Sequence, residues 1–80
     1  MYCVYLLRSL ARPGRTYIGL TDDVEKRLQS HNSGADRHTA SARPRELVVY
    51  TAFRDRHRAA QFEKYLKHGS GHAFARRHFW

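Results

Sequence analysis

The sequence predicts an α/β (α+β sandwich) fold, in which helices flank a small three-stranded, mainly antiparallel sheet. Three observations favour this class. Three short segments are rich in β-branched and aromatic residues, two others carry apolar residues at helical spacing behind a capping residue, and glycines or prolines separate them. The 80 residues are enough for one small domain and too few for two, so we expect residues 1–80 to form a single domain.

The first two elements predict a β-hairpin. Residues 2–7 and residues 16–20 are the two strands, because both segments are rich in aromatic and aliphatic side chains. Pro13 and Gly14 mark the turn between them, since proline suits the second position of a turn and glycine the third. The hairpin loop is longer and more basic than a tight turn requires.

A helix is expected directly after the hairpin. Asp22 can cap its first turn, and Glu25 follows three residues later as in a capping box. Val24 and Leu28, four residues apart, give the helix an apolar side. Gly34 is placed to end it.

The second amphipathic helix begins after Asp55, which can cap it. Ala59, Phe62 and Leu66 follow at helical spacing and predict its buried stripe. Gly69 is expected to stop this helix.

Three further segments complete the chain. Residues 35–44 are polar and basic without a period and predict a loop, whereas residues 46–53 give the strongest strand pattern of the sequence. Residues 71–80 are expected to form a short last helix whose aromatic side chains close the core.

Charge gives the first indication of function. Fifteen lysines and arginines outnumber seven aspartates and glutamates, for a formal net charge of +8, and twelve of the fifteen are arginine. Arginine binds phosphate through a planar fork, where lysine offers a point charge. This bias favours a polyanionic partner, most commonly nucleic acid, over the alternative of a basic surface kept only for solubility.

Other classes of protein are disfavoured. The single cysteine, Cys3, excludes a disulfide framework and a thiolate zinc site, and it favours a cytoplasmic location. No segment approaches the ~18 apolar residues that span a membrane, so no membrane partner is expected. A glycine-rich phosphate loop is absent, and no small-molecule organic cofactor is expected. A histidine metal site is also disfavoured. His68 and His72 are four residues apart, but Gly69 and Gly71 between them argue against a helix that would place both on one face.

Glu63 is the most informative acidic residue. On a helical wheel it lies about 40° from Ala59, at the edge of the buried stripe. A carboxylate in that position must be paired or must bind a cation. Taken alone, the favoured interpretation is a salt bridge to Lys67, four residues later.

Four other side chains are candidates for chemistry. Arg27 and His31 are four apart and share a helix face, so they could bind a phosphate and move a proton, although a solvated polar face is the simpler interpretation. Tyr5 and Tyr17 lie in the two hairpin strands, where tyrosines are usually core residues.

Together these positions resemble the GIY-YIG nuclease domain family in order and spacing. The similarity covers nearly the whole chain and is greatest to small single-domain bacterial members, which are similar to the N-terminal domain of the excinuclease C subunit. The first motif here is Cys-Val-Tyr and not Gly-Ile-Tyr. The matching positions are Tyr5, Tyr17-Ile18-Gly19, Arg27, His31 and Glu63.

The resemblance implies a metal-dependent endonuclease that hydrolyses DNA phosphodiester bonds in repair or recombination. Glu63 would hold one divalent ion, Mg²⁺ or Mn²⁺, and Arg27 would bind the scissile phosphate. Tyr5 is the favoured general base, Tyr17 would orient phosphate or water, and His31 would tune a tyrosine. The alternative is a weakly active or non-catalytic nucleic-acid-binding module of the same fold.

DNA is the expected partner, an unidentified targeting protein is left open, and the chain is expected to be a monomer or weak dimer. The residues expected to contact DNA are cationic or polar side chains near the motifs. They are Arg15, Lys26, Asn32, Arg37, Arg43, Lys64 and Lys67.

Overall fold

A computed structural model describes residues 1–34 and 43–80. The predicted loop at 35–44 therefore lies mostly outside the described residues, as does Arg37. The elements follow the predicted order, and their bounds are β1 (Tyr2–Ser9), β2 (Thr16–Thr21), α1 (Val24–Ser33), β3 (Arg45–Phe53), α2 (Arg56–Lys67) and α3 (Gly69–His78). Within the described ranges, no helix is long and apolar enough to cross a membrane.

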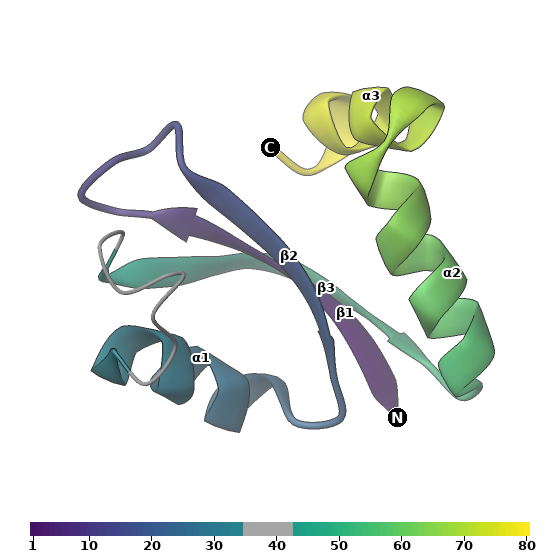
Figure 1. Ribbon diagram of the computed structural model, residues 1–80, viewed down its shortest axis with the longest axis horizontal. Helices are drawn as coiled ribbons and strands as arrows, with labels where there is room; N and C mark the ends of the chain where they lie inside the picture. The colour runs from purple at the N-terminus through teal and green to yellow at the C-terminus, as the bar shows by residue number, and fades with distance from the viewer. Residues whose placement is uncertain (35–42) are drawn as a thin grey trace.

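The three strands form one antiparallel sheet in the order β2-β1-β3. The central strand is therefore β1, and β2 has one free edge. Figure 1 shows α1 on one side of the strands and the α2–α3 pair on the other. This arrangement confirms the predicted α+β sandwich with a small antiparallel sheet.

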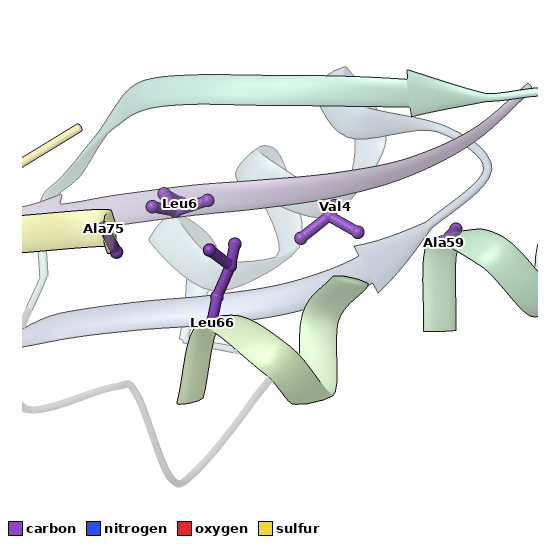
Figure 2. Packing of buried hydrophobic residues seen from close by; sticks show 5 residues of the cluster. All are labelled: Val4, Leu6, Ala59, Leu66 and Ala75. Carbon is purple, nitrogen blue, oxygen red and sulfur yellow. The ribbon is translucent and has the colours of Figure 1, made fainter. Parts of the chain in front are cut away.

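The hydrophobic core lies between the sheet and the α2–α3 pair. Val4 and Leu6 project from β1 toward Ala59 and Leu66 of α2 and Ala75 of α3, and all five side chains are fully buried (Figure 2). Because successive strand residues point to opposite faces, the residue between Val4 and Leu6 must point toward α1. That residue is Tyr5.

Two predicted helix boundaries were wrong by one or two residues. The N-cap of α1 is Asp23 and not Asp22, because the Thr21 hydroxyl accepts a hydrogen bond from the Asp23 N–H and the Asp23 carboxylate accepts one from the Lys26 N–H. The last helix begins at Gly69 and not at Gly71. Gly69 therefore starts α3, and α2 ends at Lys67.

The turn between α2 and α3 explains this second difference. His68 is extended, Gly69 has a φ of 51°, and the chain changes direction there between the two helices. A Cβ on Gly71 would collide with the Tyr65 carbonyl, so the two helices approach closely at Gly71. The expectation that these glycines argue against a helix at this point was thus wrong. Gly69 and Gly71 both belong to α3, and Gly71 lies where α3 packs against α2.

Candidate active site

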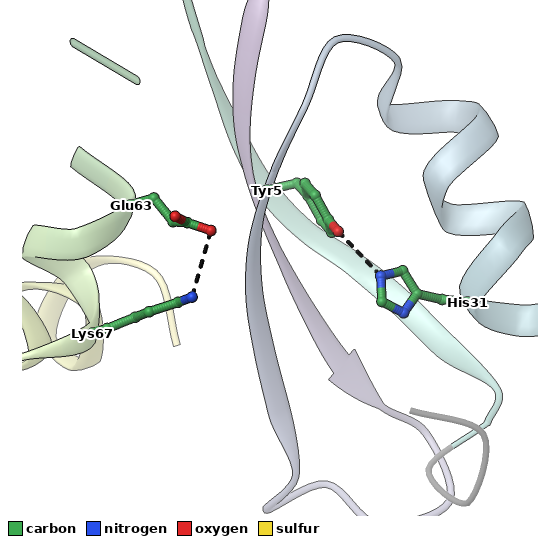
Figure 3. Close-up of polar contacts among 4 residues, drawn as sticks. All are labelled: Tyr5, His31, Glu63 and Lys67. Carbon is green, nitrogen blue, oxygen red and sulfur yellow. Dashed lines mark hydrogen bonds and ion pairs between the residues drawn. The ribbon is translucent and has the colours of Figure 1, made fainter. Parts of the chain in front are cut away.

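A buried cluster of three rings occupies the α1 side of the sheet. The Tyr5 hydroxyl and His31 Nε2 are 3.1 Å apart and share a hydrogen bond (Figure 3). The rings of Tyr17 and His31 meet edge to face with centroids 4.7 Å apart, and the Tyr5 and Tyr17 centroids are 6.0 Å apart. The fold therefore gathers Tyr5, Tyr17 and His31 from β1, β2 and α1. We call them the tyrosine–histidine cluster.

The members of this cluster differ in exposure. Tyr5 and His31 are each only 1% exposed, whereas Tyr17 is partly exposed. Tyr17 is therefore the member of the cluster that a ligand can reach most directly. The buried rings of Tyr5 and His31 pack against Tyr17.

Gly19 of β2 makes room for the Tyr5 ring. The two residues are paired across β1 and β2, and a Cβ on Gly19 would lie 2.5 Å from the Tyr5 ring. The tyrosine ring thus lies flat across the backbone of the edge strand. Its hydroxyl reaches His31 only because position 19 has no side chain.

Replacing Gly19 by alanine should therefore destabilise the protein. The new methyl group would displace the Tyr5 ring and stretch its hydrogen bond to His31, and overpacking of this kind costs about 1–3 kcal/mol. Thermal or urea unfolding would measure the loss. The Gly14→Ala variant is the matched control, because a Cβ at that loop position meets nothing within 4 Å. Equal stability of both variants would contradict the proposed contact.

Two residues of β3 and α1 complete the surroundings of Tyr17. The Arg45 guanidinium lies 5.5 Å from the Tyr17 ring centroid, in the geometry of a cation–π contact. Asn32 holds the start of β3, because its amide accepts a hydrogen bond from Arg45 N at 2.7 Å and donates one to Arg45 O at 3.0 Å. Arg45 was not among the predicted site residues, and its place directly before an apolar strand was the signal available in the sequence. The structure shows that it is buried.

Asn32, one of the residues expected to contact DNA, also has a structural role. Both ends of its amide are engaged by the Arg45 backbone, so Asn32 fixes the end of β3 against α1.

Glu63 lies on the other side of the sheet from the tyrosine–histidine cluster. It belongs to α2, which packs against the Val4 and Leu6 face of β1, and Figure 3 shows the strands passing between its carboxylate and Tyr5. One Glu63 oxygen is 3.4 Å from the Lys67 ammonium, the ion pair that the spacing allows. The sheet separates Glu63 from the phenols.

The two faces of the sheet meet at the free edge of β2. At one end of this edge, a surface hollow of about 310 Å³ is lined by β2 residues including Tyr17 and by Lys67 and His72 from the helices. At the other end, a hollow of about 200 Å³ is lined by Leu20 and Thr21 of β2, with Arg27 of α1 and Arg56 of α2 among the other residues. Lysine and arginine side chains from both faces thus lie at the β2 edge, with Asp22 also lining the second hollow.

Glu63 lies between these hollows along α2. It is seven residues after Arg56 and four before Lys67, or roughly 10 Å and 6 Å along the helix axis. Arg56 and His72 were not among the predicted site residues. Neither belongs to a motif that the sequence marks, and only the packing of α2 and α3 beside β2 brings them to this edge.

The remaining cationic residues expected to contact DNA are spread over the surface. Arg27 is exposed, as are four of the predicted DNA-contacting residues outside the two hollows. These four are Arg15, Lys26, Arg43 and Lys64. Their exposure is compatible with phosphate contacts.

Residues 1–75 match the family model described as the GIY-YIG catalytic domain. The chain belongs to the GIY-YIG family. The prediction of a GIY-YIG endonuclease domain is thereby confirmed as a family assignment.

Similar proteins occur in bacteria and fungi. The chain is 39% identical over 72 residues to a UPF0213 protein of Lacticaseibacillus paracasei, covering 89% of this chain and 79% of that protein. It is 42% identical over 84 residues to the structure-specific endonuclease subunit SLX1 of Candida dubliniensis, covering 96% of this chain and 28% of that protein. The corresponding protein of Talaromyces stipitatus is 44% identical over 73 residues, which cover 84% of this chain and 19% of the relative. The chain thus spans under a third of these fungal relatives.

Proposed function

We propose that residues 1–80 act as one nuclease domain, a divalent-metal-dependent endonuclease that hydrolyses DNA phosphodiester bonds in repair or recombination. The observation that carries this proposal is the free edge of β2. There the partly exposed Tyr17, packed against Tyr5, His31 and Arg45, lines a hollow that also contains Lys67, and Arg27 and Arg56 line a second hollow at the other end of the edge. A phosphate strand lying along this edge would meet positive charge at both ends, with Tyr17 beside one of them.

The residues present fit a cation that keeps most of its own water. The Glu63 side chain is 24% exposed, and its contact with Lys67, at 3.4 Å, is longer than a strong charged hydrogen bond. Among the described residues, no three His, Cys, Asp or Glu side chains form a group that could hold an ion. One carboxylate suits Mg²⁺ or Mn²⁺ in a site completed by water and substrate phosphate. The ion would supply Lewis-acid polarisation of that phosphate.

The chain's own residues would divide the remaining work. Arg27 would bind the scissile phosphate and stabilise the charge that develops on its oxygens. In the proposed reaction water attacks phosphorus and the phosphorus–oxygen bond of the leaving strand breaks. The Tyr17 oxygen, in its deprotonated form, would take the proton of the attacking water, and solvent would protonate the leaving oxygen. The resemblance suggested Tyr5 as the general base, but our proposal gives this role to Tyr17, because Tyr5 is buried and Tyr17 is partly exposed. We therefore assign Tyr5 and His31 to positioning Tyr17.

A targeting partner is also proposed. The fungal relatives are named as endonuclease subunits and are several times longer than the matched region. A domain that presents only one catalytic edge gains substrate selectivity when a second protein or segment positions the DNA.

Incubation with supercoiled plasmid tests the proposed activity. Nicking is expected with Mg²⁺ or Mn²⁺ and should stop when EDTA removes the ion. DNA binding without nicking, over a range of both ions and with branched as well as linear substrates, would favour the alternative of a non-catalytic binding module.

Replacing Arg27 by alanine should reduce the single-turnover cleavage rate by about 10²-fold, since one transition-state charge contact is lost. The Lys26→Ala variant removes a neighbouring exposed cation from the same helix and should change mainly affinity. If the two variants lose affinity equally and cleave bound DNA at the parent rate, Arg27 is only a tether.

A further inference from the structure

A row of aromatic rings runs along the α2–α3 pair, away from the edge of β2. The Phe62 and Tyr65 ring centroids are 6.2 Å apart, those of Tyr65 and Phe74 6.3 Å, and those of Phe74 and His78 4.6 Å. Tyr65 is 43% exposed and Phe74 37%, and His78 is also exposed. We call Tyr65, Phe74 and His78 the aromatic row.

The rings pack on one another without being covered. Tyr65 is fixed by the close approach of the two helices at Gly71, and Phe74 is held edge to face by Phe79 at 5.5 Å. Their orientation is therefore set by the helix packing, while more than a third of each residue stays open to solvent. Rigid, half-open rings of this kind can accept a flat ligand with little loss of side-chain freedom.

The surroundings of the aromatic row are strongly cationic. From Arg56 to His78 the only acidic residue is Glu63, which is already paired with Lys67. Arg77 lies three residues after Phe74 and so shares its side of α3, and Arg76 and Arg77 line a shallow hollow with Ala73. The lysines and arginines of the two helices are Arg56, Arg58, Lys64, Lys67, Arg76 and Arg77.

We propose that the aromatic row binds an unpaired strand of nucleic acid by stacking bases on Tyr65 and Phe74, with the neighbouring arginines on its phosphates. This inference rests on the proposed function, because it assumes that the chain acts on DNA. Duplex DNA hides its base faces and would use only the positive charge. Proteins bind single-stranded DNA through exposed aromatic rings and neighbouring cationic side chains, since every base has a face that can stack on a ring. A protein partner would not need this excess of positive charge.

The surface also differs in position from the candidate active site. The tyrosine–histidine cluster lies on the α1 side of the sheet, whereas the aromatic row belongs to the helices on the other side. A substrate that joins a duplex to an unpaired strand could therefore contact both at once. The paired part would lie along β2 and the single strand along α2 and α3.

Binding of a fluorescent oligo(dT) strand and of a matched duplex, both in EDTA, tests the proposal. Replacing both Tyr65 and Phe74 by leucine keeps apolar side chains in the helix contact but removes the aromatic faces. We expect oligo(dT) affinity to fall about tenfold or more and duplex affinity to change little. The Phe74→Trp variant should retain the affinity of the parent.

The Arg77→Ala variant tests the proposed phosphate contact. It should reduce the magnitude of the slope of log affinity against log salt concentration for the single strand by about 0.7.

The control is Tyr50→Leu, which removes an exposed tyrosine from the opposite side of the molecule, beside Asp22, Asp23 and Glu25. Circular dichroism and thermal unfolding confirm that each variant is folded. Unchanged oligo(dT) affinity in the folded double variant, or an equal loss in the control, overturns the proposal, and the aromatic row would then be assigned to a protein contact. Because binding is measured without a divalent ion, this result is independent of whether the chain cuts DNA.

Discussion

Replacing Glu63 by glutamine should reduce plasmid nicking roughly 10³-fold or more while DNA binding persists. The variant keeps the size of the side chain but loses the carboxylate that holds the divalent ion in our proposal. A bound cation supplies several kcal/mol of transition-state stabilisation, and each ~1.4 kcal/mol corresponds to a factor of ten in rate. Binding should hold or improve, because Lys67 is released from its ion pair and one negative charge is removed.

The matched control is Glu46→Gln, which removes the same charge from an exposed position on β3. This variant should nick DNA like the parent. Folding should be unchanged in both, because a partly exposed ion pair contributes at most about 1 kcal/mol. Binding of Mn²⁺, measured by electron paramagnetic resonance or calorimetry, gives a readout besides activity. Undiminished nicking or undiminished Mn²⁺ binding by the Glu63→Gln protein would refute the assignment.

The sequence predicted the order of the elements because each is specified locally. Alternating or continuous apolar residues mark the strands, Asp55 caps α2 as expected, and Gly34 ends α1 with a φ of 83°. The wrong start of the last helix has a tertiary cause. Gly71 reads as a helix breaker in isolation, yet it is buried in α3 because only a glycine fits against the Tyr65 backbone.

The candidate site was predictable only in part. The resemblance identified Tyr5, Tyr17 and His31, and the fold brings them into contact. The degree of burial of each depends on strand register and on which edge α1 covers, and the exposed member turned out to be Tyr17.

The side of the sheet on which Glu63 lies could not be predicted from the sequence alone. A helical wheel placed it correctly at the edge of the buried stripe and beside Lys67. It could not show that α2 and α1 pack on opposite faces of the sheet. The site that we propose therefore runs along the β2 edge.

The contrast between the two tyrosines provides the second strong test. The Tyr17→Phe variant should lose about 10³-fold in cleavage rate with little change in stability, because its hydroxyl is the accessible proton acceptor in our proposal and general acid–base groups contribute 10²–10⁴-fold. Within residues 1–34 and 43–80, the Tyr17 ring is held by His31 and Arg45, and phenylalanine keeps both ring contacts.

The Tyr5→Phe variant should behave in the opposite way. It removes the buried hydroxyl that lies 3.1 Å from His31 Nε2, and losing a buried hydrogen bond costs about 1–3 kcal/mol of stability. Its cleavage rate should fall only about tenfold at a temperature where the protein is folded, since Tyr17 is loosened and not removed. Urea unfolding and single-turnover cleavage of both variants separate the two roles. A stable Tyr5→Phe protein that has lost cleavage, beside an active Tyr17→Phe protein, would return the general-base role to Tyr5 and require that the cluster open when DNA binds.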